Sequence, residues 1–161
     1  MSQAYDGGEA VLEAFRNLGV DYIISSPGTE WPPVWEALAR QRANEIDGPG
    51  YIHCWHESLA VAIAMGYTRL TGRLQALLLH AGVGPLQAAM ALEGAWQGEV
   101  PMLVCSGGSS TYGEDPEFDP GWQWMRNHGI VGGANRLVDP VVKWSGQVSS
   151  PPTLYDTLCR A

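Results

Sequence analysis

Short apolar runs alternate along this chain with segments whose apolar residues recur at helical spacing, and this alternation constrains the fold most. The clearest run, residues 74–79, is apolar at adjacent positions rather than at every second one. A strand that is apolar on both faces is typical of a parallel sheet covered by helices on both sides. The pattern therefore predicts an α/β fold, an open parallel sheet with helices on both faces and right-handed crossovers.

Strands are expected at five places, with helical segments around them. Asp6 followed by Glu9 is typical of a helix start, and Pro27-Gly28 marks a turn after the first strand. In a sheet of this kind ligands bind at the carboxyl ends of the strands. The expected strands are residues 20–25, 51–54, 74–79, 100–105 and 138–144. The expected helices are residues 6–18, 32–39, 57–70, 85–95 and 152–161, with an acidic exposed loop at 106–121.

The composition indicates one domain with a partly covered surface. With 161 residues, of which 45% are hydrophobic, the chain is long enough to bury one core and leaves little room for a second. Only 16% of the residues are charged, against roughly 25% in an average soluble domain. We therefore expect partner protein to cover part of the surface, and we expect self-association.

Charge and hydropathy exclude several partners. The net charge of -8 opposes binding to nucleic acid and to anionic membranes, which both attract clustered Lys and Arg. The apolar runs fall far short of the roughly 20 residues that span a bilayer, and the N-terminus has no signal-like pattern, so we expect a cytoplasmic protein. The three cysteines, Cys54, Cys105 and Cys159, form no CxxC pair, which favours reduced thiols.

An acid, Glu57, stands where an expected strand gives way to a helix rich in small residues. One interpretation is that it only caps the helix, where a negative charge contributes about 0.3 to 1 kcal/mol. The nearby His53, Cys54 and His56 lack a matching distant ligand pair and do not form an HExxH motif, so we expect no metal site here.

A glycine-rich turn follows the expected strand at 74–79 and runs from His80 to Gln87. Such a turn lets a ligand approach the backbone. It is half of a dinucleotide-binding motif, because Gln87 stands where the third glycine belongs and no clear ribose-binding acid follows, so the pattern disfavours NAD. No GxSxG pentapeptide of a serine hydrolase occurs.

Several short segments, taken in order, resemble thiamine-diphosphate enzymes. Each is weak alone, but the ordered set spans nearly the whole chain. The group it is most similar to contains acetolactate synthase and benzoylformate decarboxylase, whose N-terminal pyrimidine-binding domain has an open α/β fold. The segments are Ser26-Pro27-Gly28-Thr29, His56-Glu57 with 66–72, His80-Ala81-Gly82-Val83-Gly84, 101–107 and Val142-Lys143-Trp144.

The resemblance implies thiamine diphosphate as cofactor and a 2-oxo acid as substrate, in a decarboxylase or carboligase. In that family the glutamate that matches Glu57 hydrogen-bonds the aminopyrimidine ring and favours the imino tautomer, which removes the thiazolium proton. Pro27 and Gly28 would shape the active-site turn, and Gly82 and Gln87 would lie near the cofactor.

Two further residues match positions at the active site of benzoylformate decarboxylase. His80 matches a catalytic histidine, and Thr29 falls where that enzyme has a serine beside the substrate. Both have plainer interpretations: His80 is a strand-end histidine satisfied by backbone groups, or Thr29 caps the next helix.

The family binds magnesium and the diphosphate through a Gly-Asp-Gly motif, and this chain has none; Ile46-Asp47-Gly48 lacks the first glycine. We therefore expect Mg²⁺ on a separate diphosphate-binding domain, in the same longer chain or in a partner subunit as in sulfopyruvate decarboxylase. The chain is then an N-terminal fragment or a small subunit, inactive alone, that forms a homodimer or higher oligomer. The alternative is a non-catalytic interaction module with the same fold.

Overall fold

A computed structural model describes residues 6–108, 133–148 and 150–161. Within these residues four parallel strands form one sheet in the order β2-β1-β3-β4. The strands are β1 (Tyr22–Ser26), β2 (Gly50–His53), β3 (Ala76–Leu79) and β4 (Leu103–Ser106). The α-helices are α1 (Gly7–Asn17), α2 (Pro32–Ala43), α3 (Glu57–Thr71), α4 (Val83–Gln97), α6 (Gly133–Val138) and α7 (Leu154–Arg160). Two 3₁₀ turns are η1 (Asp139–Val141) and η2 (Pro151–Thr153).

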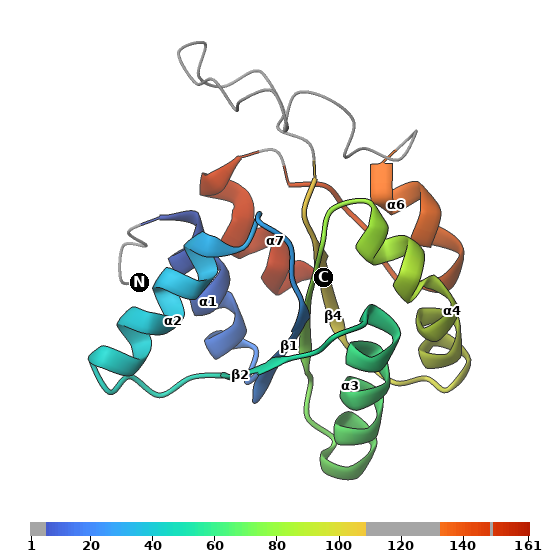
Figure 1. The fold of residues 1–161 in the computed structure, drawn as a ribbon, viewed down its shortest axis with the longest axis horizontal. Coiled ribbons are helices and arrows are strands. Elements are labelled where there is room, and N and C mark those ends of the chain that lie inside the picture. Colours follow the sequence, from blue (N-terminus) through green and yellow to red (C-terminus); the bar gives the residue numbers. More distant parts are fainter. Residues whose placement is uncertain (1–5, 109–132, 149) are drawn as a thin grey trace.

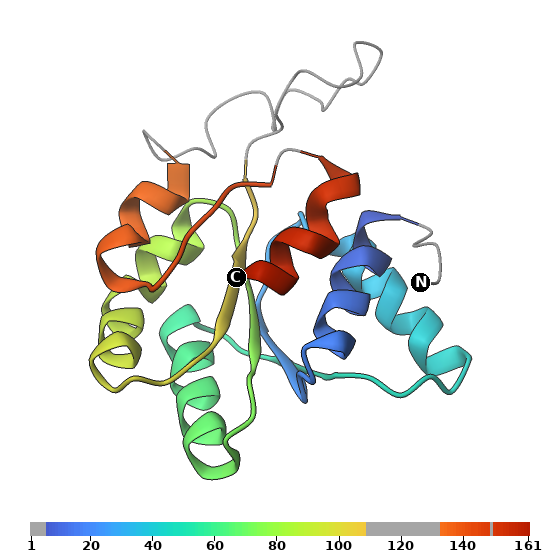
Figure 2. The same ribbon diagram turned by 180° about the vertical axis from the view of Figure 1, so that it is seen from behind.

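The sheet lies between two layers of helices (Figures 1 and 2). Helices α1, α2 and α7 cover one face, and α3, α4 and α6 cover the other. Neighbouring strand residues point into opposite cores: Ile23 and Leu78 join the first core, and Ile24 and Leu77 the second. This arrangement confirms the predicted α/β fold with a parallel sheet.

Local signals explain how the first helix begins and ends. Asp6 is the N-cap of α1, and its carboxylate accepts a 2.8 Å hydrogen bond from the backbone N–H of Glu9. That bond is the main reason why the pKa of Asp6 is lowered. After Leu18, Gly19 takes a φ of 68°, a left-handed conformation that suits glycine.

The strand order places a switch point in the middle of the sheet. β1 pairs with β2 on one side and with β3 on the other, so that Ser25 lies opposite His53 and Ser26 opposite Leu79. The connections that leave β1 and β3 therefore diverge at the carboxyl edge. A sheet of this type opens a ligand crevice at such a point.

The strand predicted at residues 138–144 is wrong. Val138 ends α6, residues 139–141 form η1, and residues 142–148 belong to neither helix nor strand. Pro140 has no N–H to give to a strand ladder, and Val138 and Val141 pack against the core beneath α4 instead of pairing with β4. Most of the loop predicted at 106–121 lies outside the described residues.

No helix in the described part of the chain is long and apolar enough to cross a membrane. All three cysteines are free thiols, with Cys54 buried and the other two partly buried.

Candidate functional site at the carboxyl edge of the sheet

Each of the four strands ends at the same edge and is followed there by a segment with candidate site residues. β1 leads into residues 27–30, β2 into His56 and Glu57, β3 into His80, and β4 into Gly107. Because the strands are parallel, this edge collects residues from distant parts of the sequence.

Glu57 is the first residue of α3, and it is not the cap. The N-cap is His56, whose Nδ1 accepts a 3.1 Å hydrogen bond from the backbone N–H of Ser58. Glu57 is partly buried, and its carboxylate has no hydrogen bond or ion pair with any residue that the structure describes. Glu57 is therefore an acid in the first turn of α3 whose oxygens are not bonded within residues 6–108, 133–148 and 150–161.

The start of α3 is tied to the first turns of α4. The hydroxyl of Ser58 donates a 2.9 Å hydrogen bond to the backbone carbonyl of Gln87, whose side chain is exposed. Gly84 lets α4 approach the sheet, because a Cβ atom there would lie 2.9 Å from Cβ of Leu79. Glu57 and Gln87 thus lie on two helices whose N-terminal ends are fixed to each other.

His80, at the end of β3, is held by Glu30 from the turn after β1. Nδ1 of His80 lies 2.9 Å from both carboxylate oxygens of Glu30, and the backbone N–H of Ala81 donates to the same carboxylate. The side chain of Glu30 is only 9% exposed and that of His80 is 31% exposed. The hydrogen-bond partner of Nδ1 is therefore a side-chain carboxylate, whereas the plainer interpretation of His80 expected a backbone group.

Two glycines make room for this pair. A Cβ atom on Gly28 would lie 2.5 Å from Cε1 of His80 and closer still to Nδ1 and to the carboxylate of Glu30. A Cβ atom on Gly107 would lie 2.5 Å from Cγ of Glu30. Any larger residue at either position would displace the carboxylate or the ring.

The remaining predicted site residues lie in the turn after β1 and at the start of α4. Pro27 precedes Gly28 in the turn after β1, and Gly82, with φ 66° and ψ -71°, precedes the first turn of α4. Thr29 is exposed and does not cap α2, whose N-cap is Trp31. The indole N–H of Trp31 instead donates a 3.0 Å hydrogen bond to the carbonyl of Leu79, which fastens the β1 turn to the end of β3.

Sequence reasoning missed Glu30. Its partner His80 is 50 residues away along the chain, and an acid just before a helix looks like an ordinary first-turn residue. One signal could have pointed to it: in a parallel sheet the turn after β1 and His80 at the end of β3 are expected at the same edge.

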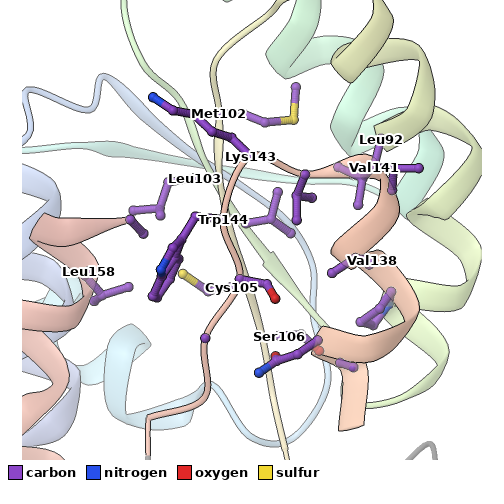
Figure 3. Close-up of a pocket in the computed structure, with 18 of the residues that line it drawn as sticks. Leu92, Met102, Leu103, Cys105, Ser106, Val138, Val141, Lys143, Trp144 and Leu158 are labelled. Atoms are coloured by element: carbon purple, nitrogen blue, oxygen red, sulfur yellow. The ribbon is translucent and has the colours of Figure 1, made fainter. Parts of the chain in front are cut away.

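A groove of about 1360 Å³ runs along β4, which is an edge strand of the described sheet (Figure 3). Its lining includes apolar side chains from β4, α7 and residues 138–148, among them Leu103, Cys105, Val141, Trp144 and Leu158. It reaches Gly82 and Gly107 at the carboxyl edge but includes neither Glu57 nor His80. Burial raises the pKa of the Cys105 thiol to about 12, so this cysteine is no nucleophile at neutral pH.

The His53, Cys54 and His56 side chains have separate roles. His53 lies against Trp55 with ring centroids 5.1 Å apart, Cys54 is buried, and His56 caps α3. Among the described residues, no group of three or more His, Cys, Asp or Glu side chains is arranged to hold a metal ion.

Comparison with known proteins places these observations in a family. The model described as "Thiamine pyrophosphate enzyme, N-terminal TPP binding domain" matches residues 5–130. The acetolactate synthase large subunit of Haemophilus influenzae is 32% identical over 101 residues, which cover 63% of this chain and 17% of that protein. The 2-hydroxyacyl-CoA lyase 2 of Xenopus laevis is 26% identical over 157 residues, covering 96% of this chain and 21% of that protein.

A solved structure shares the fold. A protein from Mycobacterium smegmatis described as a thiamin diphosphate-dependent enzyme superposes with a TM-score of 0.72 at 18% sequence identity, covering 96% of this chain and 27% of that one. The chain spans about a fifth of the length of the curated relatives it matches.

Proposed function

The chain belongs to the family of thiamine pyrophosphate enzyme N-terminal TPP-binding domains, and from this premise we propose that it binds the aminopyrimidine end of thiamine diphosphate, with Glu57 as the activating carboxylate. The whole enzyme would decarboxylate a 2-oxo acid or join it to a second carbonyl compound. The observation that carries the proposal is the carboxylate of Glu57, partly buried at the carboxyl edge and without a partner among the described residues.

The residues at this edge fit the aminopyrimidine. Glu57 offers a carboxyl group that can share a proton with a ring nitrogen, and the N-terminal amides of α3 favour its negative charge. Gly82, the N-cap of α4 with a φ of 66°, adds no side chain of its own at this edge, and Gly28 leaves room for the side chains of His80 and Glu30. Thiamine diphosphate, when bound, supplies the carbon nucleophile and stores the electrons released from the substrate.

The chain's own residues then have distinct tasks. Glu57 holds a proton toward the ring nitrogen, because a carboxyl group at hydrogen-bond distance can both give and take it. Gln87, fixed beside the start of α3 by Ser58, and Gly82 form the adjacent wall. His80 lies directly after β3 and Thr29 in the turn after β1, and either would move a proton or hold the substrate carboxylate. Pro27 keeps the β1 turn rigid.

We further propose that the diphosphate and Mg²⁺ bind on another domain, in the same longer chain or in a partner subunit. This chain lacks the Gly-Asp-Gly motif expected of that domain. It contributes only the pyrimidine half of the site.

Exposed apolar stripes on α3 and α4 support association into a homodimer. Each helix presents residues at the same spacing, and each stripe includes a glycine on which a Cβ atom would meet nothing within 4 Å. Glycine lowers the stability of an exposed helix by about 0.5 to 1 kcal/mol relative to alanine. The packing of the described residues gives no reason for a glycine at position 66 or 94. The stripes are Leu59, Ala62, Gly66 and Leu70 on α3, and Val83, Leu86, Met90 and Gly94 on α4.

The dimer is tested by light scattering over a range of concentrations. Leu70 is 89% exposed and Met90 is 82% exposed, so charged substitutions there cost the isolated fold little. We expect a dimer that Leu70→Glu and Met90→Glu dissociate. A single monomeric species at high concentration would count against the association.

The same stripes favour the second candidate function, a non-catalytic interaction module. Both functions need an exposed apolar surface, but only the catalytic one needs the carboxylate of Glu57. Replacement of that group therefore separates them.

The deciding experiment uses the chain together with its diphosphate-binding domain or subunit, thiamine diphosphate, Mg²⁺ and a panel of 2-oxo acids. Glu57→Gln should lower carbon dioxide release by about 100-fold or more, as expected for loss of an acid–base group. The matched control is Glu36→Gln, because Glu36 is an exposed acid on α2 that makes no interaction with the described residues. Equal turnover in wild type and Glu57→Gln would refute the role of Glu57, and no turnover with any substrate would favour the interaction module.

A further inference from the structure

We propose that Glu30 is a positioning residue that fixes the tautomer and the ring orientation of His80. The pair joins the ends of the two central strands, β1 and β3, at the switch point of the sheet. The role of this pair in catalysis rests on the proposed function, whereas the contact between Glu30 and His80 is independent of it.

The carboxylate of Glu30 is built into the fold. Its side chain is 9% exposed, and two donors converge on it, Nδ1 of His80 and the backbone N–H of Ala81. The N–H of Ala81 belongs to the residue directly after His80, so the carboxylate is anchored to the same strand end as the ring it holds. A buried carboxylate is expensive unless such donors surround it.

The chemistry of the pair selects one tautomer. An ionised carboxylate only accepts hydrogen bonds, so Nδ1, at 2.9 Å from both oxygens, must carry the hydrogen. In the neutral ring the lone pair is then on Nε2. Without the carboxylate, the ring is released to the Nε2–H tautomer that isolated histidine favours.

The surrounding glycines limit the alternatives. The space beside the ring and the carboxylate is open only because positions 28 and 107 lack a Cβ atom. Backbone from the ends of β1 and β4 therefore encloses the pair on two sides. The hydroxyl of Ser106 also donates to the carbonyl of His80 at 3.4 Å, which adds a contact between the ends of β3 and β4.

The consequence for the proposed reaction is that Nε2 is the basic nitrogen of the neutral His80 ring. A ring held through Nδ1 acts as a proton acceptor through Nε2, the nitrogen on the far side of the ring from Glu30. Glu30 does not touch substrate or cofactor in this scheme; it acts through His80. The arrangement follows the general pattern in which a carboxylate orients a histidine base.

The test is a long-range ¹H–¹⁵N correlation spectrum of the ¹⁵N-labelled chain, which distinguishes the two ring nitrogens of neutral His80. In the wild type we expect Nδ1 to be the protonated nitrogen and Nε2 the unprotonated one. An Nε2–H tautomer in the folded wild type would overturn the proposal without any variant.

Two variants extend the test. Glu30→Ala removes the acceptor, and Glu30→Gln keeps the shape but can turn an NH₂ group toward Nδ1; in both we expect the Nε2–H form of His80 to become a major species. Glu36→Gln is the control and should leave the His80 signals unchanged. If Glu30→Gln folds, as judged by its amide spectrum, and keeps the wild-type tautomer, Glu30 does not set it.

An activity measurement separates this proposal from the proposed function. In the assembled enzyme, Glu30→Gln should lower kcat by about 10-fold or more, within the range expected of an impaired acid–base group. If the wild type has the expected tautomer and the assembled enzyme is inactive on every 2-oxo acid, the proposed function fails and the positioning role stands. An unchanged kcat in Glu30→Gln with an altered tautomer would refute the link between this tautomer and catalysis.

Discussion

Replacing Gly28 by alanine should disrupt the Glu30–His80 pair and destabilise the chain. The new Cβ atom would lie 2.5 Å from Cε1 of His80 and closer still to Nδ1, whereas ordinary contact begins at 3.4 Å, so the ring must move by more than about 0.9 Å. A displacement of that size takes Nδ1 out of good hydrogen-bonding range of Glu30, which it now meets at 2.9 Å. The carboxylate of Glu30 is held in place by the N–H of Ala81 and by the close approach of Gly107.

The expected cost is about 2 kcal/mol, in the middle of the range of about 1 to 3 kcal/mol for adding a methyl group to a packed site. With a denaturant dependence of about 2 kcal/mol per molar urea, the unfolding midpoint falls by about 1 M. The assay is urea unfolding followed by tryptophan fluorescence, at a concentration low enough for a monomer. Gly66→Ala is the matched control: nothing lies within 4 Å of its Cβ position, so it should raise stability by about 0.5 to 1 kcal/mol. Opposite signs are required; an unchanged midpoint in Gly28→Ala with an intact Nδ1–H signal for His80 would refute the reasoning.

Three further outcomes are expected. Asp6→Ala removes the cap of α1 and should lower the free energy of unfolding by about 1 kcal/mol at neutral pH. Because the N–H of Glu9 lowers the pKa of Asp6 in the folded chain, this difference should persist above about pH 4 and vanish as the pH falls through that lowered pKa. Urea unfolding from pH 7 to pH 2 would show it. With a thiol pKa of about 12, Cys105 should react with iodoacetamide at pH 8 orders of magnitude more slowly in the folded than in the urea-unfolded chain, and peptide mass mapping that finds equal rates would contradict this. Gly8→Ala should destabilise the chain by about 3 kcal/mol in total, more than Gly28→Ala does. Its Cβ atom would lie 2.8 Å from the backbone N of Val34 and closer to the carbonyl of Pro33, and backbone atoms cannot rotate away as a side chain can. A smaller shift in the urea midpoint than for Gly28→Ala would speak against this.

The fold could be predicted because its signals are local. The uninterrupted apolar run at β3 indicates burial on both faces, and Asp6 and Gly19 mark the ends of α1. The strand expected at 138–144 failed because an apolar run alone does not say whether it pairs or packs, and Val138 and Val141 pack.

The site divides in the same way. Glu57 could be located at the start of α3 because the acid opens a strongly apolar helical segment, and its role stays a prediction. Glu30 could not, because its role depends on β1 lying next to β3, and strand order is a property of the whole chain. The cap of α3 also went to His56 rather than to Glu57, since side-chain direction at a helix end depends on backbone angles that composition does not give.

The parallel arrangement also gives the molecule a second edge that is free for engineering. The connections at the amino ends of the strands lie at the other end of the sheet from Glu57 and His80 (Figure 1). Residues 44–48, in the connection from α2 to β2, are exposed. A peptide tag or a fluorescent label inserted between Glu45 and Asp47 should therefore leave the residues at the carboxyl edge in place.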